Sequence, residues 1–549
     1  MRRGPVGAAR CSPVGAVRSV QCRAVRGVGP DGDTPERCDT LRAMPEDLAE
    51  RPAARRSPHG YVLAAMVVLV AVAYAVYELT VYRTYRSSTY DLVIFDQAVR
   101  SYSHFHLPVA IVKGVHNNFG AQFTVLGDHF SPIIAVLAPL YWISGNPKTL
   151  LVAQSVLLAG AIPWLWVYAR RASGTFAAYC VVVIYAVSWP VAAAVAFDFH
   201  ETAFVPLLSA VLLERYQAGR RVHAVLAACL LLLVKEDIGL LVAGFGLFLV
   251  TGCRLPAQEK YARQRLLGAA FVVGGVGWTL VATHVFIPAF GGRGNYYWAY
   301  TALGPDLPSA TTHAIAHPVS TLQLFGTPSI KITTMTWLVV PLLLLPLASP
   351  LTLMVIPALA ARMGSNLFPN WWGEEYQYNA ELIVPLVAAG LDGALRINML
   401  LTRLRPIWTW TKRIGPAWAA GALMVSVAVI PKFAFDAYGQ SSFYRLTPAD
   451  RAAATAAGHV PDGVVVEAAS LIGPHLSARD TVLLLDKTPR WAPWVVAQIS
   501  DPTFPISDAA AQKARVTYLE TNGYRPVWHD DFYVVLTKPG SVPDYTRHG

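Results

Sequence analysis

Apolar runs separated by short charged segments fill the sequence from about residue 61 to residue 432. The first run, Tyr61 to Thr80, matches the roughly 20 residues that a helix needs to cross a hydrocarbon core of about 30 Å. Of the 549 residues, 54% are hydrophobic and only 14% are charged, whereas soluble domains contain about 25% charged residues. The sequence therefore predicts a polytopic membrane protein.

The charged segments between the apolar runs alternate in kind. The acidic ones are Asp91 with Asp96, 127–129, 198–201, 235–237 and 374–375. The arginine-rich ones are 170–171, 215–221, 254–265 and 396–413. Lys and Arg favour the cytoplasmic side of membrane loops, so we expect the arginine-rich turns inside and the acidic segments outside. The same bias accounts for the net charge of +11 without nucleic acid, which we do not expect as a partner.

About eleven spans are expected. They are 61–80, 148–169, 175–193, 202–218, 222–234, 238–252, 267–288, 332–348, 350–362, 379–396 and 416–432. The segment 130–142 is short and contains two prolines, so we predict a re-entrant or interfacial helix there. Counting this segment as a membrane crossing would place every later loop on the opposite side of the membrane. The expected outer loops are 81–147 and 289–330.

The expected membrane domain, 60–432, has a different segment on each side of it. Residues 1–59 are rich in Arg, Pro, Gly and Ala, which is typical of a disordered tail. We expect this tail to be basic and cytoplasmic. Whether the protein starts at Met1 or at Met44 stays open. Residues 433–549 predict a small extracytoplasmic α/β domain. Its expected strands are 464–466, 481–485, 516–519 and 532–536, and its expected helices are 467–475 and 507–514.

The first outer loop carries two acids, Asp91 and Asp96. On one helix they would lie about 140° apart at 3.6 residues per turn, so they can face one point only if the helix begins between them. Asp91 would then cap the helix while Asp96 or Arg100 faces a cavity. The alternative is a capped interfacial helix with solvated acids.

Two further acidic segments contain histidine. Asp128 and His129 could bind a divalent cation or relay a proton, or Asp128 could simply cap a helix. Asp198, His200 and Glu201 interrupt two apolar stretches. A plain turn there would more cheaply use Gly, Asn or Ser, so we favour a functional interpretation.

Lys235, Glu236 and Asp237 interrupt another apolar run. The lysine could neutralise its acidic neighbours, or it could face a phosphate while a carboxylate orients it. Arg293 lies in a loop of glycines and aromatic residues, and Tyr376 and Tyr378 lie in a second aromatic segment. Aromatic faces suit sugar rings, although Trp and Tyr are also ordinary at membrane interfaces.

Several of these segments together resemble one family. They are YDLVIFDQAVR at 90–100, GDHFSPIIAVLAPLYW at 127–142, FDFHETAFVPLL at 197–208, VKEDIGL at 234–240, SPLTLMVIPALAARM at 349–363 and YQYNAELIVPLVAAG at 376–390. They resemble domain-of-unknown-function family 2079, a family of bacterial polytopic membrane proteins, over roughly residues 60 to 540. That family in turn looks like a branch of the GT-C superfamily of membrane glycosyltransferases, which implies a GT-C-like membrane all-α fold.

The resemblance implies a sugar transfer from a polyprenyl-phosphate carrier, with an essential acid in the first outer loop. In the superfamily pattern an Asp precedes an aromatic residue by four positions and an Arg by nine, and Asp91, Phe95 and Arg100 match this spacing. Many members carry an Asp-Glu pair where this sequence has Asp91-Leu92. That departure leaves the metal dependence and the identity of the base open.

The expected function is therefore hexosyl or pentosyl transfer at the bacterial plasma membrane, onto a cell-envelope glycan, lipid or protein. Asp91 or Asp96 would be the base, and Asp128 would support it directly or through Mg²⁺ or Mn²⁺ bound by Asp91, Asp128 and His129. Substrate contacts are expected from Arg100, His129, Asp198, His200, Glu201, Lys235, Glu236, Asp237, Arg293, Tyr376 and Tyr378. The rivals are a transporter with a carboxylate relay, which should show repeated halves, and a non-catalytic envelope-assembly protein.

Overall fold

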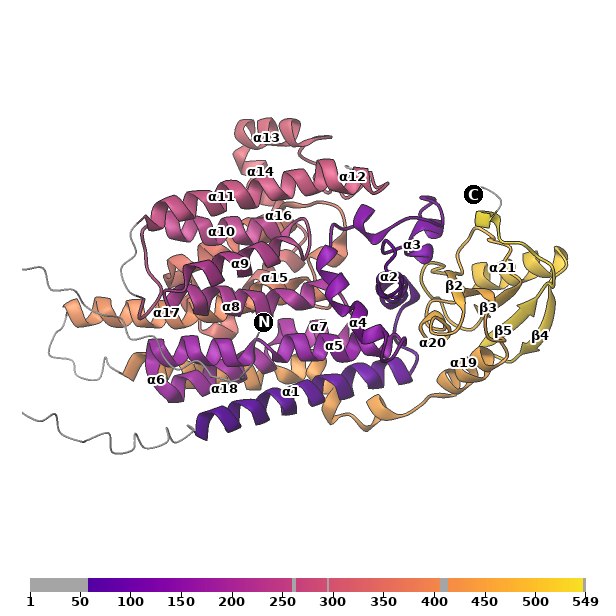
Figure 1. Cartoon of the computed structure of the whole chain (residues 1–549), viewed down its shortest axis with the longest axis horizontal. Helices are drawn as coiled ribbons and strands as arrows, with labels where there is room; N and C mark the ends of the chain where they lie inside the picture. The colour runs from indigo at the N-terminus through magenta and orange to yellow at the C-terminus, as the bar shows by residue number, and fades with distance from the viewer. Residues whose placement is uncertain (1–57, 259–262, 294–295, 405–412, 547–549) are drawn as a thin grey trace, which may run out of the picture. The chain divides into compact units, whose positions relative to one another are not determined.

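The computed structural model of the chain describes residues 58–258, 263–293, 296–404 and 413–546. The expected tail at 1–59, including Met44, lies outside these residues except for its last two positions. The described chain is mostly helical, with a small sheet near the carboxyl terminus (Figure 1).

Five apolar stretches of the described chain are long enough to cross a membrane: Pro58–Arg83, Lys148–Ala196, Gln264–Ala289, Gln377–Leu404 and Ile414–Lys432. Shorter apolar helices lie at Pro132–Tyr141, Arg221–Leu232, Ile238–Val250 and Ile330–Leu342. Helix α1, Pro58–Arg83, exposes Val68, Leu69 and Val72, as a lipid-facing helix would. The finding supports a membrane protein, and the count of eleven spans stays a prediction.

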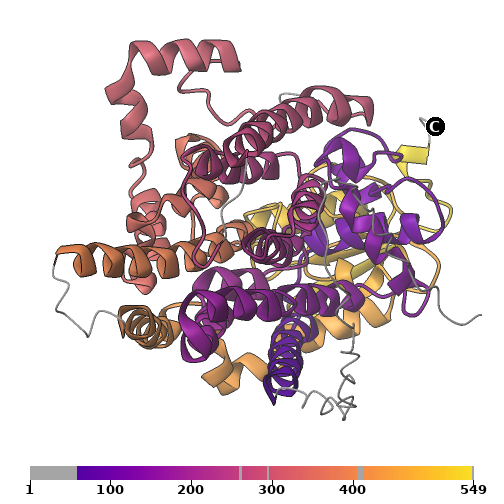
Figure 2. The same cartoon turned by 60° about the vertical axis from the view of Figure 1, so that its left-hand side comes forward.

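The helices of the bundle are joined by connections of very different length. Their bounds are α5 Lys148–Ala159, α6 Ile162–Val187, α7 Trp189–Ala196, α8 Phe204–Gln217, α9 Arg221–Leu232, α10 Ile238–Val250, α11 Gln264–Val281, α12 Ile287–Ala289, α13 Leu307–Ala316, α14 Pro318–Leu324, α15 Ile330–Val339, α16 Ile356–Gly364, α17 Ala380–Leu404 and α18 Ile414–Ala428. Helices α13 and α14 stand off from the others in two views (Figures 1 and 2).

Several expected spans are not single α-helices: 175–193 is interrupted at Ser188, and 350–362 begins as a 3₁₀ turn. The clearest case is 332–348. Residues 332–348 do not form one continuous helix, because α15 ends at Val339 and two short 3₁₀ turns follow. Leu343 and Leu344 adopt left-handed backbone conformations between those turns. Pro341 and Pro346 lack the N–H that a continuing helix needs, which explains the break.

The two ends of the bundle differ in charge. At one end Arg171 pairs with Glu214 at 2.6 Å, and Arg396 donates to the carbonyl of Arg254. The segment between α1 and α5 lies at the opposite end, where it forms α2 Ile94–Ser103, α3 Ile111–His116 and α4 Ala138–Tyr141 (Figure 1). The arginine-rich turns and the acidic segments thus lie at opposite ends of the bundle.

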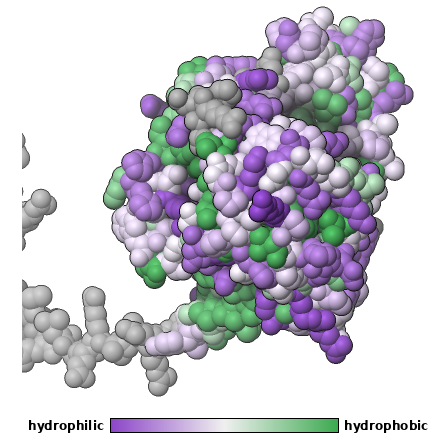
Figure 3. All heavy atoms as spheres, turned by 90° about the vertical axis from the view of Figure 1, so that its right-hand side faces the viewer, coloured by the Kyte–Doolittle hydropathy of each residue, from purple (hydrophilic) through white to green (hydrophobic). Residues whose placement is uncertain are grey.

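The carboxyl-terminal sheet has the order β2-β1-β3-β5-β4. Its strands are β1 Val465–Ala468, β2 Thr481–Leu484, β3 Trp494–Gln498, β4 Arg525–His529 and β5 Tyr533–Thr537, with helices α19 Pro448–Gly458, α20 Gly473–Leu476 and α21 Ala509–Thr521. The first three strands pair in parallel, and β5 pairs antiparallel with β3 and β4. The surface at this end mixes hydrophilic residues with scattered apolar ones (Figure 3).

Two expectations for this domain were wrong. Glu467 lies on β1 rather than on a helix, and 516–519 lie on α21 rather than on a strand. Gln512, Val516 and Leu519 are buried at spacings of four and three, which is the period of a helix face. The helical period was hard to recognise in the sequence, because Val516, Thr517 and Tyr518 are residue types that favour strands.

The sheet domain is attached to the segment that precedes Asp91. Thr89 donates to the carbonyl of Ser470 through its backbone N–H at 2.7 Å and through its hydroxyl at 2.6 Å. The ring of His475 stacks on Tyr85 with 3.8 Å between centroids, and Tyr82 donates to Pro474. These contacts fix the start of the first loop against the domain.

Candidate functional site

The first loop begins with a single π-helical turn, Thr89–Val93, and continues as α2 from Ile94. The side chain of Ser88 caps this turn by accepting from the N–H of Tyr90. The expectation that Asp91 is the cap was therefore wrong. Because the change of helix type falls between Asp91 and Asp96, the two carboxylates have different neighbours.

Asp91 is the more accessible of the two acids. Its side chain is 27% exposed, and its Oδ1 lies 3.7 Å from Nε2 of His200. That separation exceeds a hydrogen bond, so a hydroxyl or a water fits as a bridge between them. Burial raises the pKa of Asp91, which His200 partly offsets.

The backbone sets the proton on His200. Its Nδ1 lies 3.0 Å from the carbonyl of Asp198, and a carbonyl only accepts hydrogen bonds. Nδ1 therefore carries a proton, and whenever the ring is neutral its Nε2 faces Asp91 as an acceptor. Burial lowers the pKa of His200, while Asp91 acts in the opposite direction. A shared hydroxyl can donate to only one of these two groups at a time.

Asp198 lies beneath the loop. Its Oδ2 accepts from the backbone N–H of Ser88 at 2.6 Å, while its Oδ1 has no hydrogen-bond partner among the described residues. Burial, and then the neighbouring Asp91, raise the pKa of Asp198 to about 7. Asp198 thus holds the loop that carries Asp91 and adds a titratable charge beside it.

Asp96 has structural partners on every side. It is fully buried, pairs with Arg100 at 3.0 Å and accepts from the hydroxyl of Tyr141 at 2.7 Å. Arg100 also donates to the carbonyl of Gly145. The structure therefore places Asp96 and Arg100 in the contact between α2 and the interfacial segment. Among the described residues, neither forms a hydrogen bond or an ion pair with Asp91 or His200.

Asp128 contacts a lysine that the sequence analysis did not single out. Its carboxylate lies 3.0 Å from Nζ of Lys113 and accepts from the hydroxyl of Tyr297 at 2.7 Å. Burial alone would lower the pKa of Lys113, but Asp128 and Tyr90 raise it overall. Lys113 is a charged residue inside the apolar segment 109–115, and that signal could have identified it.

A second group of charges surrounds Lys235. Its Nζ lies 3.9 Å from carboxylate oxygens of Glu201 and of Asp237, and it lies over the ring of Tyr378 at 5.7 Å. Oε1 of Glu236 lies 2.8 Å from Nδ1 of His129. Burial would raise the pKa of Glu236, but His129 and Lys235 lower it to about 2.

Electrostatic interactions join the two groups. The charges of Asp91 and Lys235 both shift the pKa of His200. They also both shift the pKa of Tyr378. The residues gathered at this end of the bundle are Asp91, Asp198, His200, Glu201, Lys235, Glu236, Asp237, His129 and Tyr378. We refer to this set as the acidic site.

Other expected contacts lie at its margin. Tyr376 packs edge-on against Phe197 at 5.2 Å, and burial, followed by the charges of Glu375 and Asp91, raises its pKa. Arg293 is exposed and lies over the ring of Phe119 at 5.6 Å. The contact with Phe119 places Arg293 on the surface of the outer loops.

Sequence reasoning missed three further polar residues. Glu78, in α1, is buried and accepts from Gln154 and Ser155, and Gln154 in turn accepts from the N–H of His200. Arg362 is buried and donates to the carbonyls of Trp371 and Tyr378. Glu78 and Arg362 each lie in an expected span, where a charge is expensive, and that cost was the available signal.

The candidate metal ligands have separate partners. Asp91 faces His200, Asp128 faces Lys113, and His129 faces Glu236. Within the described ranges, no three His, Cys, Asp or Glu side chains are grouped so that they could hold a metal ion. The arrangement therefore does not fit a site formed by Asp91, Asp128 and His129.

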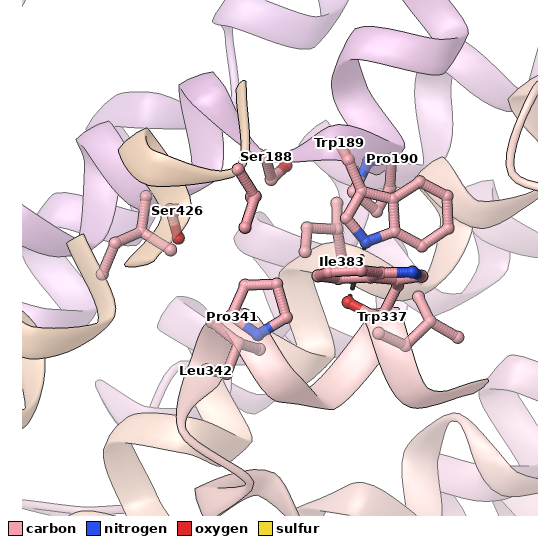
Figure 4. A pocket seen from close by; sticks show the side chains of 11 residues that line it. Ser188, Trp189, Pro190, Trp337, Pro341, Leu342, Ile383 and Ser426 are labelled. Atoms are coloured by element: carbon pink, nitrogen blue, oxygen red, sulfur yellow. Dashed lines mark hydrogen bonds between the residues drawn. The ribbon is translucent and has the colours of Figure 1, made fainter. Parts of the chain in front are cut away.

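A separate apolar hollow lies among the helices (Figure 4). Trp189, Trp337, Pro341 and Ile383 line it, and the indole of Trp189 donates to the carbonyl of Trp337 at 2.8 Å. Its lining residues include no titratable side chain. The hollow therefore offers no side chain for acid–base chemistry.

Comparisons with known proteins give one family. The model described as "Predicted membrane protein (DUF2079)" matches residues 82–535, and no curated protein matches. Among solved structures, ArnT from Cupriavidus metallidurans bound to undecaprenyl phosphate is 13% identical with a TM-score of 0.41, covering 89% of this chain and 100% of that one. The oligosaccharyltransferase AglB from Archaeoglobus fulgidus, in complex with an inhibitory peptide and a dolichol-phosphate, is 10% identical with a TM-score of 0.37, covering 84% and 69%.

Proposed function

This chain belongs to the DUF2079 family of predicted membrane proteins, and we propose that it transfers a sugar from a polyprenyl-phosphate donor to an acceptor hydroxyl at the acidic site. The observation that carries the proposal is the pair of Asp91 and His200, a partly exposed carboxylate 3.7 Å from an imidazole. The spacing of Asp91, Phe95 and Arg100 supports the same reaction class. Phe95 packs on His200, so this spacing also positions the pair.

In the proposed reaction the ionised carboxylate of Asp91 takes the proton of the acceptor hydroxyl. The acceptor oxygen forms a bond to the anomeric carbon as the bond from that carbon to the phosphate oxygen breaks. The electron pair leaves with polyprenyl phosphate, and the configuration inverts. A general base of this kind contributes about 10²–10⁴-fold.

Lys235 is the proposed partner of the departing phosphate. Its contacts to Glu201 and Asp237 are 3.9 Å long, longer than hydrogen bonds, so its ammonium can still donate to an incoming oxygen. Charge that builds up on the phosphate in the transition state would be stabilised there. A divalent cation is not used in this scheme, because Asp128 is already paired with Lys113.

The test is transfer by the purified full chain, incubated with a panel of labelled polyprenyl-phosphate sugars and a membrane extract as acceptor. Asp91→Asn should reduce the rate by about 10²-fold or more. Asp306→Asn is the matched control, because Asp306 is an exposed helix cap and Asn caps equally well. Full activity of Asp91→Asn would remove the proposed base, and uptake of a solute into liposomes without a lipid-linked sugar would favour a transporter.

A further inference from the structure

The carboxyl-terminal domain has a hollow that the proposed transfer does not use. Its volume is about 280 Å³, and Lys487, Pro489, Ile506, Ala511, Arg515 and Tyr518 line it. Lys487 and Pro489 follow the end of β2, and Ala511 lies in the first turn of α21. Ligands of sheets with parallel strands bind beyond the carboxyl ends of the strands, and β2 pairs in parallel with β1.

Arg515 lines this hollow and has one unfilled donor. Its side chain is only 5% exposed, and its Nη2 pairs with Glu467 at 3.0 Å. Its Nε donates to the carbonyl of Asp486, whereas Nη1 is buried without a hydrogen-bond partner in the part of the chain that the structure describes. An unmet buried donor is costly, so an acceptor is expected at this place.

The nearby carboxylates already have partners. Glu467 accepts from the N–H groups of Arg490 and Ala492 besides pairing with Arg515. Asp486 pairs with His116 at 2.8 Å and with Arg490 at 3.2 Å. Lys487, exposed at the edge of the hollow, therefore adds positive charge to a region whose acids are already neutralised.

The amino-terminal end of α21 is not the source of binding. Asp508 already accepts from the N–H groups of Ala510 and Ala511. Among the residues that line the hollow, the charged donors are the side chains of Arg515 and Lys487. Tyr518, 48% exposed, adds a ring of the kind that packs on a sugar.

We propose that this hollow binds a small anionic sugar, held at its phosphate or carboxylate by Arg515 and Lys487 and at its ring by Tyr518. The volume of about 280 Å³ lies just below the lower end of the range of binding pockets, roughly 300 Å³, which suits a small ligand. The inference does not depend on the proposed transfer.

The test is equilibrium binding to the full chain in detergent, with inorganic phosphate, glucose 1-phosphate, glucuronate and neutral glucose as probes. At least one of the two anionic sugars should bind, and glucose should not. Binding by only one of them identifies the group as phosphate or carboxylate. No binding by either anionic sugar at millimolar concentration, or equal binding of glucose, would overturn the proposal.

Three variants sharpen that test. Lys487→Gln should weaken binding of the anionic sugar roughly three- to tenfold, and Tyr518→Ala should weaken it without changing the binding of inorganic phosphate. Lys513→Gln is the control, because Lys513 is exposed on the same helix and does not line the hollow. Equal effects of Lys487→Gln and Lys513→Gln would also overturn the proposal. Asp91→Asn should bind normally, which separates this result from failure of the transfer reaction.

Discussion

Asp91 and Asp96 are the same kind of residue, five positions apart, and their surroundings give them different roles. Asp96 is fully buried against Arg100 and Tyr141, whereas Asp91 reaches solvent and faces His200. A base must be reachable by its substrate and able to ionise. Only the surroundings of Asp91 meet the first condition.

The pair of Asp96 and Arg100 should therefore matter for stability. Asp96→Asn keeps the size of the side chain but leaves Arg100 without its counter-charge. We expect a loss of about 1–3 kcal/mol in the free energy of unfolding, measured as a lower thermal midpoint in detergent. The folded fraction of this variant should keep its transfer rate, and a loss as large as that of Asp91→Asn would contradict the assignment.

Asp198 should make the reaction depend on pH. Its pKa is raised from 3.8 to about 7, so it ionises as the pH rises through 7, and its charge then raises the basicity of Asp91. The transfer rate should rise through pH 7 in the natural protein. In Asp198→Asn this inflection should disappear from the pH–rate profile, and its persistence near pH 7 would exclude Asp198 as its cause.

The same shift has the opposite effect on stability. The unfolded chain ionises Asp198 at the lower pKa, so between about pH 4 and pH 7 the folded state holds the extra proton. Stability falls as pH rises when the folded state binds more protons. Asp198 therefore contributes most to stability at the acidic end of this range, where it is least useful to the base.

At the scale of elements, α10 and α11 pack through glycines. A Cβ on Gly275 would lie 2.7 Å from the backbone N of Ala243, whereas one on Gly274 or on Gly277 would have no described atom within 4 Å. Backbones approach this closely only where one residue lacks a side chain. The contact fixes the helix that follows Lys235, Glu236 and Asp237.

Three single alanine substitutions on α11 test this contact. Gly275→Ala should lower the thermal midpoint, because overpacking costs about 1–3 kcal/mol against a gain of up to about 1 kcal/mol in helix propensity. Gly274→Ala and Gly277→Ala gain the propensity without the clash and should leave the midpoint unchanged or higher. Equal midpoints for all three variants would mean that α10 and α11 separate more than the structure shows.

Sequence reasoning worked where a single local signal decided the structure. The apolar runs predicted helices at α1, α10 and α17, and the charge alternation predicted which turns lie at the same end. It failed at 332–348 and at 516–519, where hydropathy gave no sign of a broken helix or of a helix rich in strand-forming residues. It identified Asp91 and His200 as candidates, but their contact joins residues more than a hundred positions apart, which no local pattern records.

At the scale of the whole chain, the acidic site depends on both regions. The helices supply His200 and Lys235, while the sheet domain holds the turn that carries Asp91 through Ser470 and Thr89. The domain lies beside α2 (Figure 1), and Ser88, next to Thr89, donates to Asp198 of the acidic site. The site is thus positioned by contacts that span most of the chain.

This arrangement predicts that the two ends of the bundle face opposite sides of the membrane. In a background without the six natural cysteines, Lys513→Cys places a thiol on the sheet domain and Arg403→Cys places one near the end of α17, both exposed. An impermeant maleimide should label position 513 in intact cells and position 403 only after permeabilisation, because Arg-rich turns stay in the cytoplasm. The cysteine-free protein is the control for background. Labelling of both positions in intact cells would contradict the opposite placement, and labelling of position 403 alone would invert it and bring the acidic site to the cytoplasmic side.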